Sequence, residues 1–277
     1  IYDYSCQLWV SDGTVAGTKA ITSFAKTIFN TSLINQTAQL HNELYFTLDV
    51  FGTDTPELTT QVFKTDGTAA GTKVVFSVPK DPESTVTSIS QLSANAAGVF
   101  VVTASLQQQQ TRQQLWYWDQ QQLTALSELT DVYDFVRFSD GIAYISGGSI
   151  YRSNGTAAGT GLLLKLPPPT GPNEGFNHLT VTPDFRYLFF SGKDDSDKIR
   201  LWRSDGSGAG TVVIGQPLSE FNFALHAQVG QDVYLTTYRT ISNLNYVEQL
   251  SRYSLTDTTA VDIYSQRIAD LNNLLPV

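Results

Sequence analysis

The segment Arg200–Thr211, RLWRSDGSGAGT, carries the pattern that decides the fold of this chain. After Arg200 it has an apolar pair, Leu201-Trp202, then continues through a hydroxyl residue and Asp-Gly, and ends in Ala-Gly-Thr. Asp-Gly is a strong hairpin signal, because glycine adopts positive φ without the steric cost that other residues bear. Three further copies are Gln7–Thr18 (QLWVSDGTVAGT), Gln61–Thr72 (QVFKTDGTAAGT) and Ser149–Thr160 (SIYRSNGTAAGT). Each copy predicts a strand, a tight turn and a second strand.

Two weaker copies, Gln114–Asp119 and Gln249–Ser254, keep the apolar strand and lose the glycine turn. The aliphatic residue of the pair then recurs, mostly at intervals of about fifty residues, along the whole chain. These markers are Leu8, Val62, Leu115, Ile150, Leu201 and Leu250. Six units at this spacing are typical of a β-propeller with four strands in each blade.

An apolar and aromatic triplet precedes five of the markers. The triplets are Leu44–Phe46, Val99–Val101, Ala143–Ile145, Leu188–Phe190 and Val233–Leu235. Continuous apolar runs predict strands that neighbouring blades cover on both faces. We expect the aromatic residue after each marker to pack between blades, with a stacking surface for sugar rings as the alternative. These residues are Trp9, Phe63, Trp116, Tyr151 and Trp202.

The predicted fold is therefore all-β, a single β-propeller domain over residues 1–277 with about six blades of four antiparallel strands. The expected units span approximately residues 1–22 with 266–277, 36–80, 88–128, 132–167, 176–216 and 224–265. In this arrangement the N- and C-terminal segments share one blade. An open edge that recruits another chain is the alternative. The glutamines of residues 107–110 are expected at an exposed hairpin tip.

The repeat resembles the bacterial family named for its Glu-Leu-Trp-x-x-Asp-Gly-Thr motif. The resemblance rests on Gln7–Thr14, on Arg200–Ser207, on the Ala-Gly-Thr that follows each, and on the triplet Leu44–Phe46. It covers essentially the whole chain. Gln or Arg stands where the family has its leading Glu. The resemblance implies a propeller in a secreted or surface protein, and it implies no activity and no catalytic residues.

Composition and charge exclude several classes of function. Charged residues make up 16% of the chain, and 17 basic against 26 acidic side chains give a net charge of −9. No basic stripe is present that could neutralise phosphates, which argues against nucleic acid as a partner. No apolar run is long enough for a membrane span. The uncharged polar surface suits an extracellular protein, and the lone Cys6 excludes an internal disulfide. Because position 1 is not Met, we expect a chain that has been processed, trimmed or cut from something larger, and a removed secretion signal fits this expectation.

The turn residues are the most regular polar positions, and we expect their role to be structural. They are Asp12, Gly13, Asp66, Gly67, Asn154, Gly155, Asp205 and Gly206. The side-chain oxygen can accept a hydrogen bond from the backbone two residues on. Asn154 in one copy argues against a metal site at these turns, because a ligand carboxylate would be missing there.

Candidate binding residues are few. His178 and His226 are expected to begin the first strands of adjacent units and to share one rim of the channel, where they are candidate binding residues. Asp194, Asp195 and Asp197 form the densest acidic run and are the candidates for calcium. The spacing is not that of a calcium-binding helix–loop–helix, so a solvated loop is the competing interpretation. No cofactor and no other metal site is expected.

The function expected from these patterns is that of a non-enzymatic extracellular module for structure or interaction. A surface protein, an adhesin or a fibre building block would fit, with other protein chains or copies of itself as partners. One alternative is a glycan-binding propeller whose partner is a polysaccharide. Another is a glycosidase or polysaccharide lyase on a propeller scaffold.

Overall fold

The structure is a computed structural model that describes most of the chain and contains no helix in that part. The described ranges are 6–24, 34–51, 58–79, 81–84, 87–107, 110–132, 134–165, 179–194, 196–218, 223–242, 245–257 and 259–267. These residues belong to two compact units, which are described separately below. Unit 1 is Ile1–Asp131 with Asn154–Thr160, and unit 2 is Val132–Ser153 with Gly161–Val277.

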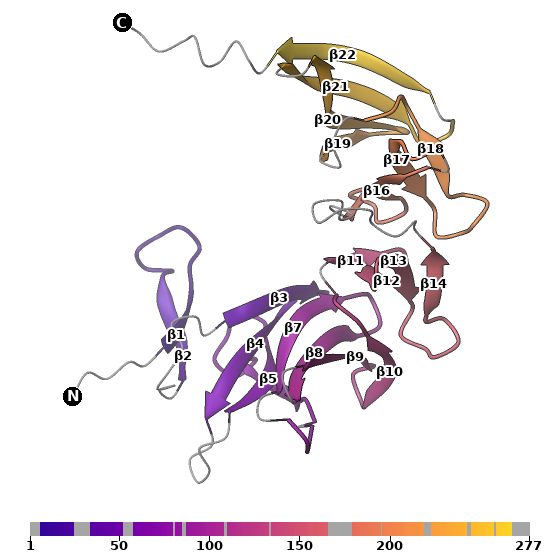
Figure 1. The fold of residues 1–277 in the computed structure, drawn as a ribbon. Coiled ribbons are helices and arrows are strands. Elements are labelled where there is room, and N and C mark those ends of the chain that lie inside the picture. Colours follow the sequence, from indigo (N-terminus) through magenta and orange to yellow (C-terminus); the bar gives the residue numbers. More distant parts are fainter. Residues whose placement is uncertain are drawn as a thin grey trace, which may run out of the picture. The chain divides into compact units, whose positions relative to one another are not determined.

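The first three sheets lie in unit 1 (Figure 1). Sheet 1 contains β1 (Cys6–Val10) and β2 (Lys19–Phe24). Sheet 2 contains β3 (Ile34–Leu40), β4 (Glu43–Phe51), β5 (Leu58–Thr65) and β6 (Lys73–Ser77). Sheet 3 contains β7 (Thr87–Ala94), β8 (Val99–Gln107), β9 (Gln110–Trp118) and β10 (Leu123–Leu129).

The strands of the other three sheets lie in unit 2. Sheet 4 contains β11 (Asp134–Phe138), β12 (Gly141–Ser146), β13 (Ser149–Ser153) and β14 (Gly161–Leu164). Sheet 5 contains β15 (Thr180–Val181), β16 (Leu188–Lys193), β17 (Ile199–Ser204) and β18 (Val212–Ile214). Sheet 6 contains β19 (Phe223–Val229), β20 (Asp232–Ser242), β21 (Asn245–Ser254) and β22 (Ala260–Arg267).

Sheets 2 to 6 are each an antiparallel meander of four strands, which pair in the order of the sequence. Four-stranded antiparallel meanders of this kind are the blades of a β-propeller, so the expected fold class is confirmed. Sheet 1 has two strands among the described residues. Residues 266–277 are the segment expected to complete sheet 1. Residues 268–277 lie outside the described part of the chain, and residues 266 and 267 belong to β22 of sheet 6. The single-domain boundary and the shared blade stay predictions.

Burial explains why the triplets are apolar without alternation. Val99, Phe100, Val101 and Val102 in β8 are all 0% exposed, so both faces of this strand are covered. Within unit 1, apolar clusters join sheet 1 to sheet 2 and sheet 2 to sheet 3. Within unit 2, they join sheet 4 to sheet 5 and sheet 5 to sheet 6. The core is therefore a series of layers between successive blades.

Three of the five aromatic residues after the markers follow the expected packing, and Tyr151 stacks on Tyr144 of its own sheet. Phe63, Trp116 and Trp202 pack against the clusters between adjacent sheets. Within the sheets, cross-strand neighbours stack, as Trp202 does on Phe190 with ring centroids 6.1 Å apart. Trp9 is different, because 56% of its surface is exposed. Sheet 1 has only β1 and β2 to surround it among the described residues.

Two arginines at the same position of the repeat connect neighbouring blades of unit 2. Arg152 in β13 donates a hydrogen bond to the carbonyl oxygen of Gly206, in the turn of sheet 5, at 3.0 Å. Arg203 in β17 donates to the carbonyl oxygen of Leu255, next to the turn of sheet 6, at 2.5 Å. Sheet 4 is thus bonded to the turn of sheet 5, and sheet 5 to the turn of sheet 6. The corresponding residue of unit 1, Lys64, instead forms an ion pair with Glu43 of its own sheet.

Candidate functional site

The repeated turn connects the last two strands of a sheet, and its polar side chains bond to one another. In the turn after β1, Asp12 Oδ1 accepts hydrogen bonds from the Thr14 amide at 2.9 Å and from the Thr14 hydroxyl at 2.7 Å. The Thr14 hydroxyl oxygen in turn accepts the Gly17 amide at 2.9 Å. Thr18 closes the loop by donating to the Thr14 carbonyl oxygen at 2.6 Å. The Asp, the two Thr and the final Gly of this repeat thus bond to one another inside their own turn.

The other copies repeat this network with their own residues. Asp66 accepts from Thr68, Asn154 accepts from Thr156, and Asp205 accepts from Ser207. The following glycines adopt positive φ, between 85° and 92°, which an L side chain rarely tolerates. They are Gly13, Gly67, Gly155 and Gly206. The turn residues therefore fix the backbone of the hairpin.

These hydrogen bonds change the acidity of the turn carboxyls. The hydroxyl of Thr14, followed by its amide, holds the pKa of Asp12 below its usual value of 3.8. The hydroxyl of Thr68 lowers the pKa of Asp66, and that of Ser207 lowers the pKa of Asp205. Hydrogen bonds to the ionised form favour it. These carboxyls are thus bound acceptors at neutral pH and poorly suited to donate a proton in catalysis.

The weak copies keep the acceptor although they lose the glycine. Asp119, after β9, accepts the amides of Gln121 and Gln122 at 2.9 and 2.8 Å. Asp257, after β21, accepts the amide of Thr259 at 2.8 Å. Gln120 takes the place of the glycine and still adopts a positive φ of 76°. The sequence pattern shows the loss of glycine, whereas the structure shows that the backbone conformation survives it.

The two histidines are not brought together by what the structure describes. His178 lies outside the described residues. His226 is the fourth residue of β19 and does not begin that strand, and its Nε2 lies 2.7 Å from the Thr236 hydroxyl. It faces a pocket of about 420 Å³ with Tyr234, Glu248 and Tyr264 of the same sheet. A shared histidine rim stays a prediction.

The acidic run in the hairpin between β16 and β17 is bound within its own loop. Asp194 Oδ1 accepts the amides of Ser196 and Lys198 at 2.8 and 3.1 Å, and Asp197 forms an ion pair with Lys193 at 2.9 Å. Asp195 lies outside the described residues. In the described part of the chain, no three ligating side chains gather into a group that could hold a metal ion.

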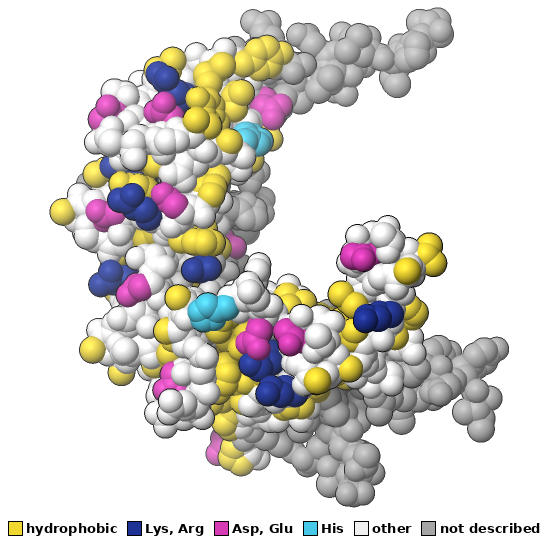
Figure 2. All heavy atoms as spheres, turned by 180° about the vertical axis from the view of Figure 1, so that it is seen from behind, with side chains coloured by type: hydrophobic (Ala, Val, Ile, Leu, Met, Phe, Trp, Pro, Cys, Tyr) yellow, Lys and Arg dark blue, Asp and Glu magenta, His cyan; other side chains and the backbone are white. Residues whose placement is uncertain are grey.

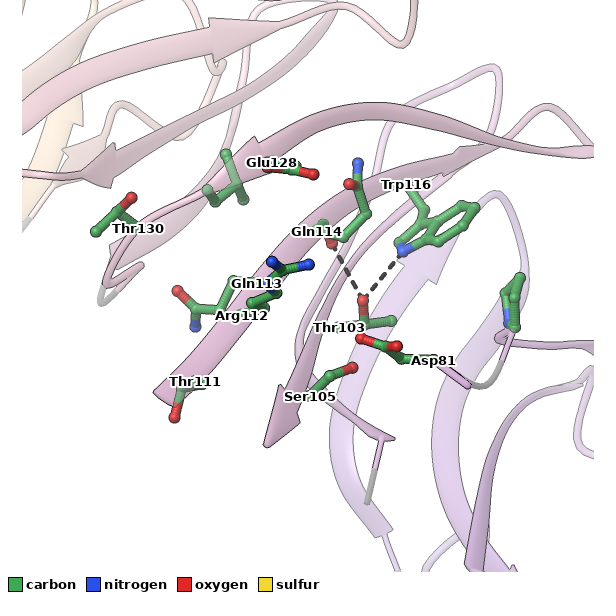
Figure 3. Close-up of a pocket in the computed structure, with 12 residues that line it drawn as sticks. Asp81, Thr103, Ser105, Thr111, Arg112, Gln113, Gln114, Trp116, Glu128 and Thr130 are labelled. Carbon is green, nitrogen blue, oxygen red and sulfur yellow. Dashed lines mark hydrogen bonds between the residues drawn. The ribbon is translucent and has the colours of Figure 1, made fainter. Parts of the chain in front are cut away.

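A polar pocket of about 470 Å³ on sheet 3 stands out on the described surface (Figure 3). Its walls come from β8, β9 and β10 and from the segment after β6, which supplies Pro79 and Asp81. Trp116 donates its indole N–H to the Thr103 hydroxyl at 3.0 Å, so the ring is held in one orientation. Among the described residues, neither Arg112 nor Glu128 has an ion-pair partner.

In the sequence, only Trp116, with its alternative role as a stacking surface, points to this pocket. Arg112, Glu128 and Asp81 carry no pattern in the sequence. The register of β8, β9 and β10 brings the first two together, and the chain after β6 adds the third.

Figure 2 shows basic side chains interspersed with acidic ones on the face it displays. The described residues contain no helix that is long and apolar enough to cross a membrane.

Neither a family model nor a curated protein matches the chain in sequence. Solved structures do match in fold. The dipeptidyl peptidase 4 of Porphyromonas gingivalis is similar over 87% of this chain and 38% of its own, at 13% identity and a TM-score of 0.54. A prolyl endopeptidase structure is similar over 84% of this chain and 34% of its own, at 14% identity and a TM-score of 0.52. The chain thus spans little more than a third of either peptidase.

The β-propeller domain of the Trilobed protease from Pyrococcus furiosus, described as having an open velcro topology, is also similar. It matches 92% of this chain and 75% of its own, at 13% identity and a TM-score of 0.46. Identities this low show fold and not function, because one fold hosts many activities. The chain is an all-β protein with propeller blades, and proteins similar to it in fold include enzymes.

Proposed function

We propose that this chain is a secreted, non-enzymatic β-propeller module that acts through contacts with other macromolecules. The observation that supports it is that the acidic side chains of the turns accept hydrogen bonds within the turns. The turn carboxyls Asp12, Asp66 and Asp205 are hydrogen-bonded acceptors with lowered pKa values. A glycosidase needs the opposite, a carboxyl whose pKa is raised so that it can donate its proton.

The Glu-Leu-Trp-x-x-Asp-Gly-Thr repeat is proposed as the family to which the chain belongs. The Asp, Thr and final Gly of the repeat have roles in the turn, as the bonds of Asp66, Thr68 and Gly71 illustrate. These roles stabilise a hairpin and leave no side chain for chemistry. The repeat therefore supports a scaffold, and a secreted or surface location is the proposed setting for it.

Location and assembly test this proposal directly. The source organism is fractionated, and the chain is followed in cytoplasm, cell surface and medium. Native material is then imaged by negative-stain electron microscopy and weighed by mass determination. We expect surface or medium material, either in ordered polymers or bound to another macromolecule. Cytoplasmic material that stays a particle of 30.4 kDa without a bound partner would contradict the proposal.

Turnover is the second test, because the proposal denies an activity. Purified chain is incubated with polysaccharide and peptide substrates, and new reducing ends, unsaturated products and free amines are measured. We expect no product above a heat-unfolded control. Sustained turnover that is lost on replacing Glu128 by Gln, the unpaired carboxylate of the sheet 3 pocket, would replace our proposal with an enzyme.

Glycan binding is the second candidate, and the sheet 3 pocket is the observation that favours it. The pocket combines a fixed indole ring with hydroxyl, amide and charged groups, as Trp116, Thr103 and Gln114 show. A polysaccharide would then be the macromolecular partner of the module.

A further inference from the structure

One face of sheet 3 is divided into an apolar and a polar half. Register places Val99 opposite Trp118 and Val101 opposite Trp116, and at this end the face packs against sheet 2. Further along the same strands, Thr103 lies opposite Gln114, and Ser105 lies opposite Arg112. Alternate residues of a strand share a face, so the polar residues continue the surface that the apolar ones begin. The pocket occupies the polar half.

Trp116 lies at the boundary between the two halves. Its ring packs against the apolar cluster, and the same residue also lines the pocket. The hydrogen bond to Thr103, itself 4% exposed, fixes the indole before any ligand arrives. A ligand that meets this wall contacts a rigid apolar ring, which lowers the entropy lost on binding.

Two polar side chains of the pocket are held in place by hydrogen bonds. Gln114 donates to the carbonyl oxygens of Leu115 and Ser127 at 2.9 and 2.7 Å, so its amide is held in place and its Oε1 remains an acceptor. Asp81 is held likewise, by the Glu83 amide at 3.0 Å and the Gln107 amide group at 2.6 Å. Figure 3 shows Arg112 and Glu128 farther along β9 and β10 than the indole.

We propose, as a deepening of the proposed binding function on which it rests, that this pocket binds neutral carbohydrate. A sugar ring presents C–H groups on one face and hydroxyl groups around its edge. The C–H face matches the indole of Trp116, and the hydroxyls match carboxylate, amide and guanidinium partners. At about 470 Å³ the pocket falls within the range of roughly 300–1,000 Å³ of small-molecule sites.

Charge selects neutral over acidic sugars. Asp81 and Glu128 place two carboxylates on the lining, against the single guanidinium of Arg112. Glu83 adds a third carboxylate at the adjoining hollow that Arg112 also lines. A uronic acid or sulfated sugar would meet net repulsion, whereas the hydroxyls of a neutral sugar can donate to the carboxylates and accept from Arg112.

The repeat itself supplies a matched control for the role of Trp116. Trp202 occupies the same position after its marker, packs between sheets and donates its indole N–H to the Gly192 carbonyl oxygen at 3.2 Å. It does not line the sheet 3 pocket. Replacing each tryptophan by Phe removes the same atoms from comparable surroundings, so only the pocket distinguishes the two variants.

The experiment applies the full chain to an array of neutral, uronic and sulfated oligosaccharides, and then measures affinities for the bound glycans by calorimetry. We expect binding to neutral glycans, weakened about tenfold by Trp116→Phe and by Arg112→Gln and unchanged by Trp202→Phe. Arg112 is exposed, so its variant is expected to fold, and unfolding midpoints of all variants are compared first.

Three outcomes would overturn the carbohydrate pocket. They are no glycan bound, binding confined to anionic glycans, and neutral binding that Trp116→Phe and Arg112→Gln leave at the wild-type level. None of these outcomes contradicts the proposed function of the chain as a secreted module, because its location and assembly are measured separately. Conversely, turnover of a bound neutral glycan would overturn the non-enzymatic proposal and leave the pocket in place.

Discussion

Gly210 illustrates how the repeat restricts single residues. A Cβ atom on Gly210 would lie 2.0 Å from Oδ1 of Asp205, the carboxylate that bonds to Ser207 in the same turn. Gly17, Gly71 and Gly159 face the same obstacle in the other copies. Gly208, two residues earlier, meets nothing within 4 Å. The final glycine of the motif is required by this close approach, whereas Gly208 has no such constraint.

Two alanine variants in that turn separate these cases. Gly210→Ala should lower the free energy of unfolding by about 1–2 kcal/mol, because the methyl group displaces the Asp205 carboxylate from its bonds. Gly208→Ala should leave it unchanged or raise it by up to about 1 kcal/mol, because the unfolded chain loses freedom. Urea unfolding midpoints at constant slope measure both. Equal effects of the two variants would contradict the argument.

The hairpin between β9 and β10 shows how an element survives a weakened motif. Asp119 keeps its two amide bonds, while Gln120 holds the positive φ that glycine holds elsewhere. A side chain in the left-handed region costs roughly 1–2 kcal/mol. The Gln120 amide group recovers part of this cost by donating to the Ala97 carbonyl oxygen at 3.1 Å, at an exposed position.

Gln120→Gly should therefore stabilise the chain by about 0.5 kcal/mol, since the steric cost disappears while the exposed hydrogen bond is worth little. The matched control is Gln121→Gly, at a residue without positive φ, which should destabilise the turn through added freedom of the unfolded chain. The thermal unfolding midpoints of both variants, compared with that of the wild type, test these two expectations. A loss of stability in Gln120→Gly would show that the bond to Ala97 matters more than the backbone strain.

The connection between blades is tested by Arg203, whose guanidinium bonds to the backbone of sheet 6. Arg203→Met should lower the free energy of unfolding by about 1.5–3 kcal/mol, because carbonyl oxygens lose a charged donor. Lys64→Met removes the residue at the same repeat position in unit 1, where the ion pair with Glu43 is partly exposed, and should cost under about 1 kcal/mol. Denaturant titration measures the free energy of unfolding of both variants. A larger loss in Lys64→Met than in Arg203→Met would refute the stabilising role of the connection between blades.

At the scale of the whole molecule, the turns make stability depend on acid. The turn carboxyls have pKa values below 3.8 in the folded state, so the folded protein binds fewer protons than the unfolded chain near that pH. Their contribution to stability is complete above 3.8 and disappears as the pH falls through the lowered values. Asn154 makes the same bonds with an amide and does not titrate.

The double variant Asp66→Asn, Asp205→Asn tests this dependence. The asparagine copy of the turn shows that the bonds survive the exchange, so the fold should persist near neutral pH. Between about pH 5 and about pH 2, the unfolding midpoint should fall less in the variant than in the wild type, because two shifted carboxyls are gone. Parallel curves for the two proteins would mean that other groups control acid unfolding.

The blades were predictable because their causes are local. Asp-Gly turns, apolar triplets and a period of about fifty residues suffice to predict four-stranded antiparallel sheets, since a tight hairpin pairs strands that are neighbours in sequence. The roles of Asp66 and Gly67 in the turn follow in the same way. The continuous apolar triplet Val99–Val101 likewise indicated that both faces of its strand would be covered, and all three residues are 0% exposed.

The pocket, the arginine connections and the place of His226 depended on tertiary structure. Arg112 and Glu128 line the same pocket because of the register of β9 and β10, which includes a bulge, and Asp81 is added from the segment after β6. Arg203 reaches a carbonyl oxygen fifty-two residues away in the sequence. A local pattern fixes which strands pair and how they turn. The pattern predicted that Phe63, Trp116 and Trp202 would pack between blades. The partners of Arg152 and Arg203, and the pocket neighbours of Arg112, are instead decided by packing between segments that are distant in sequence.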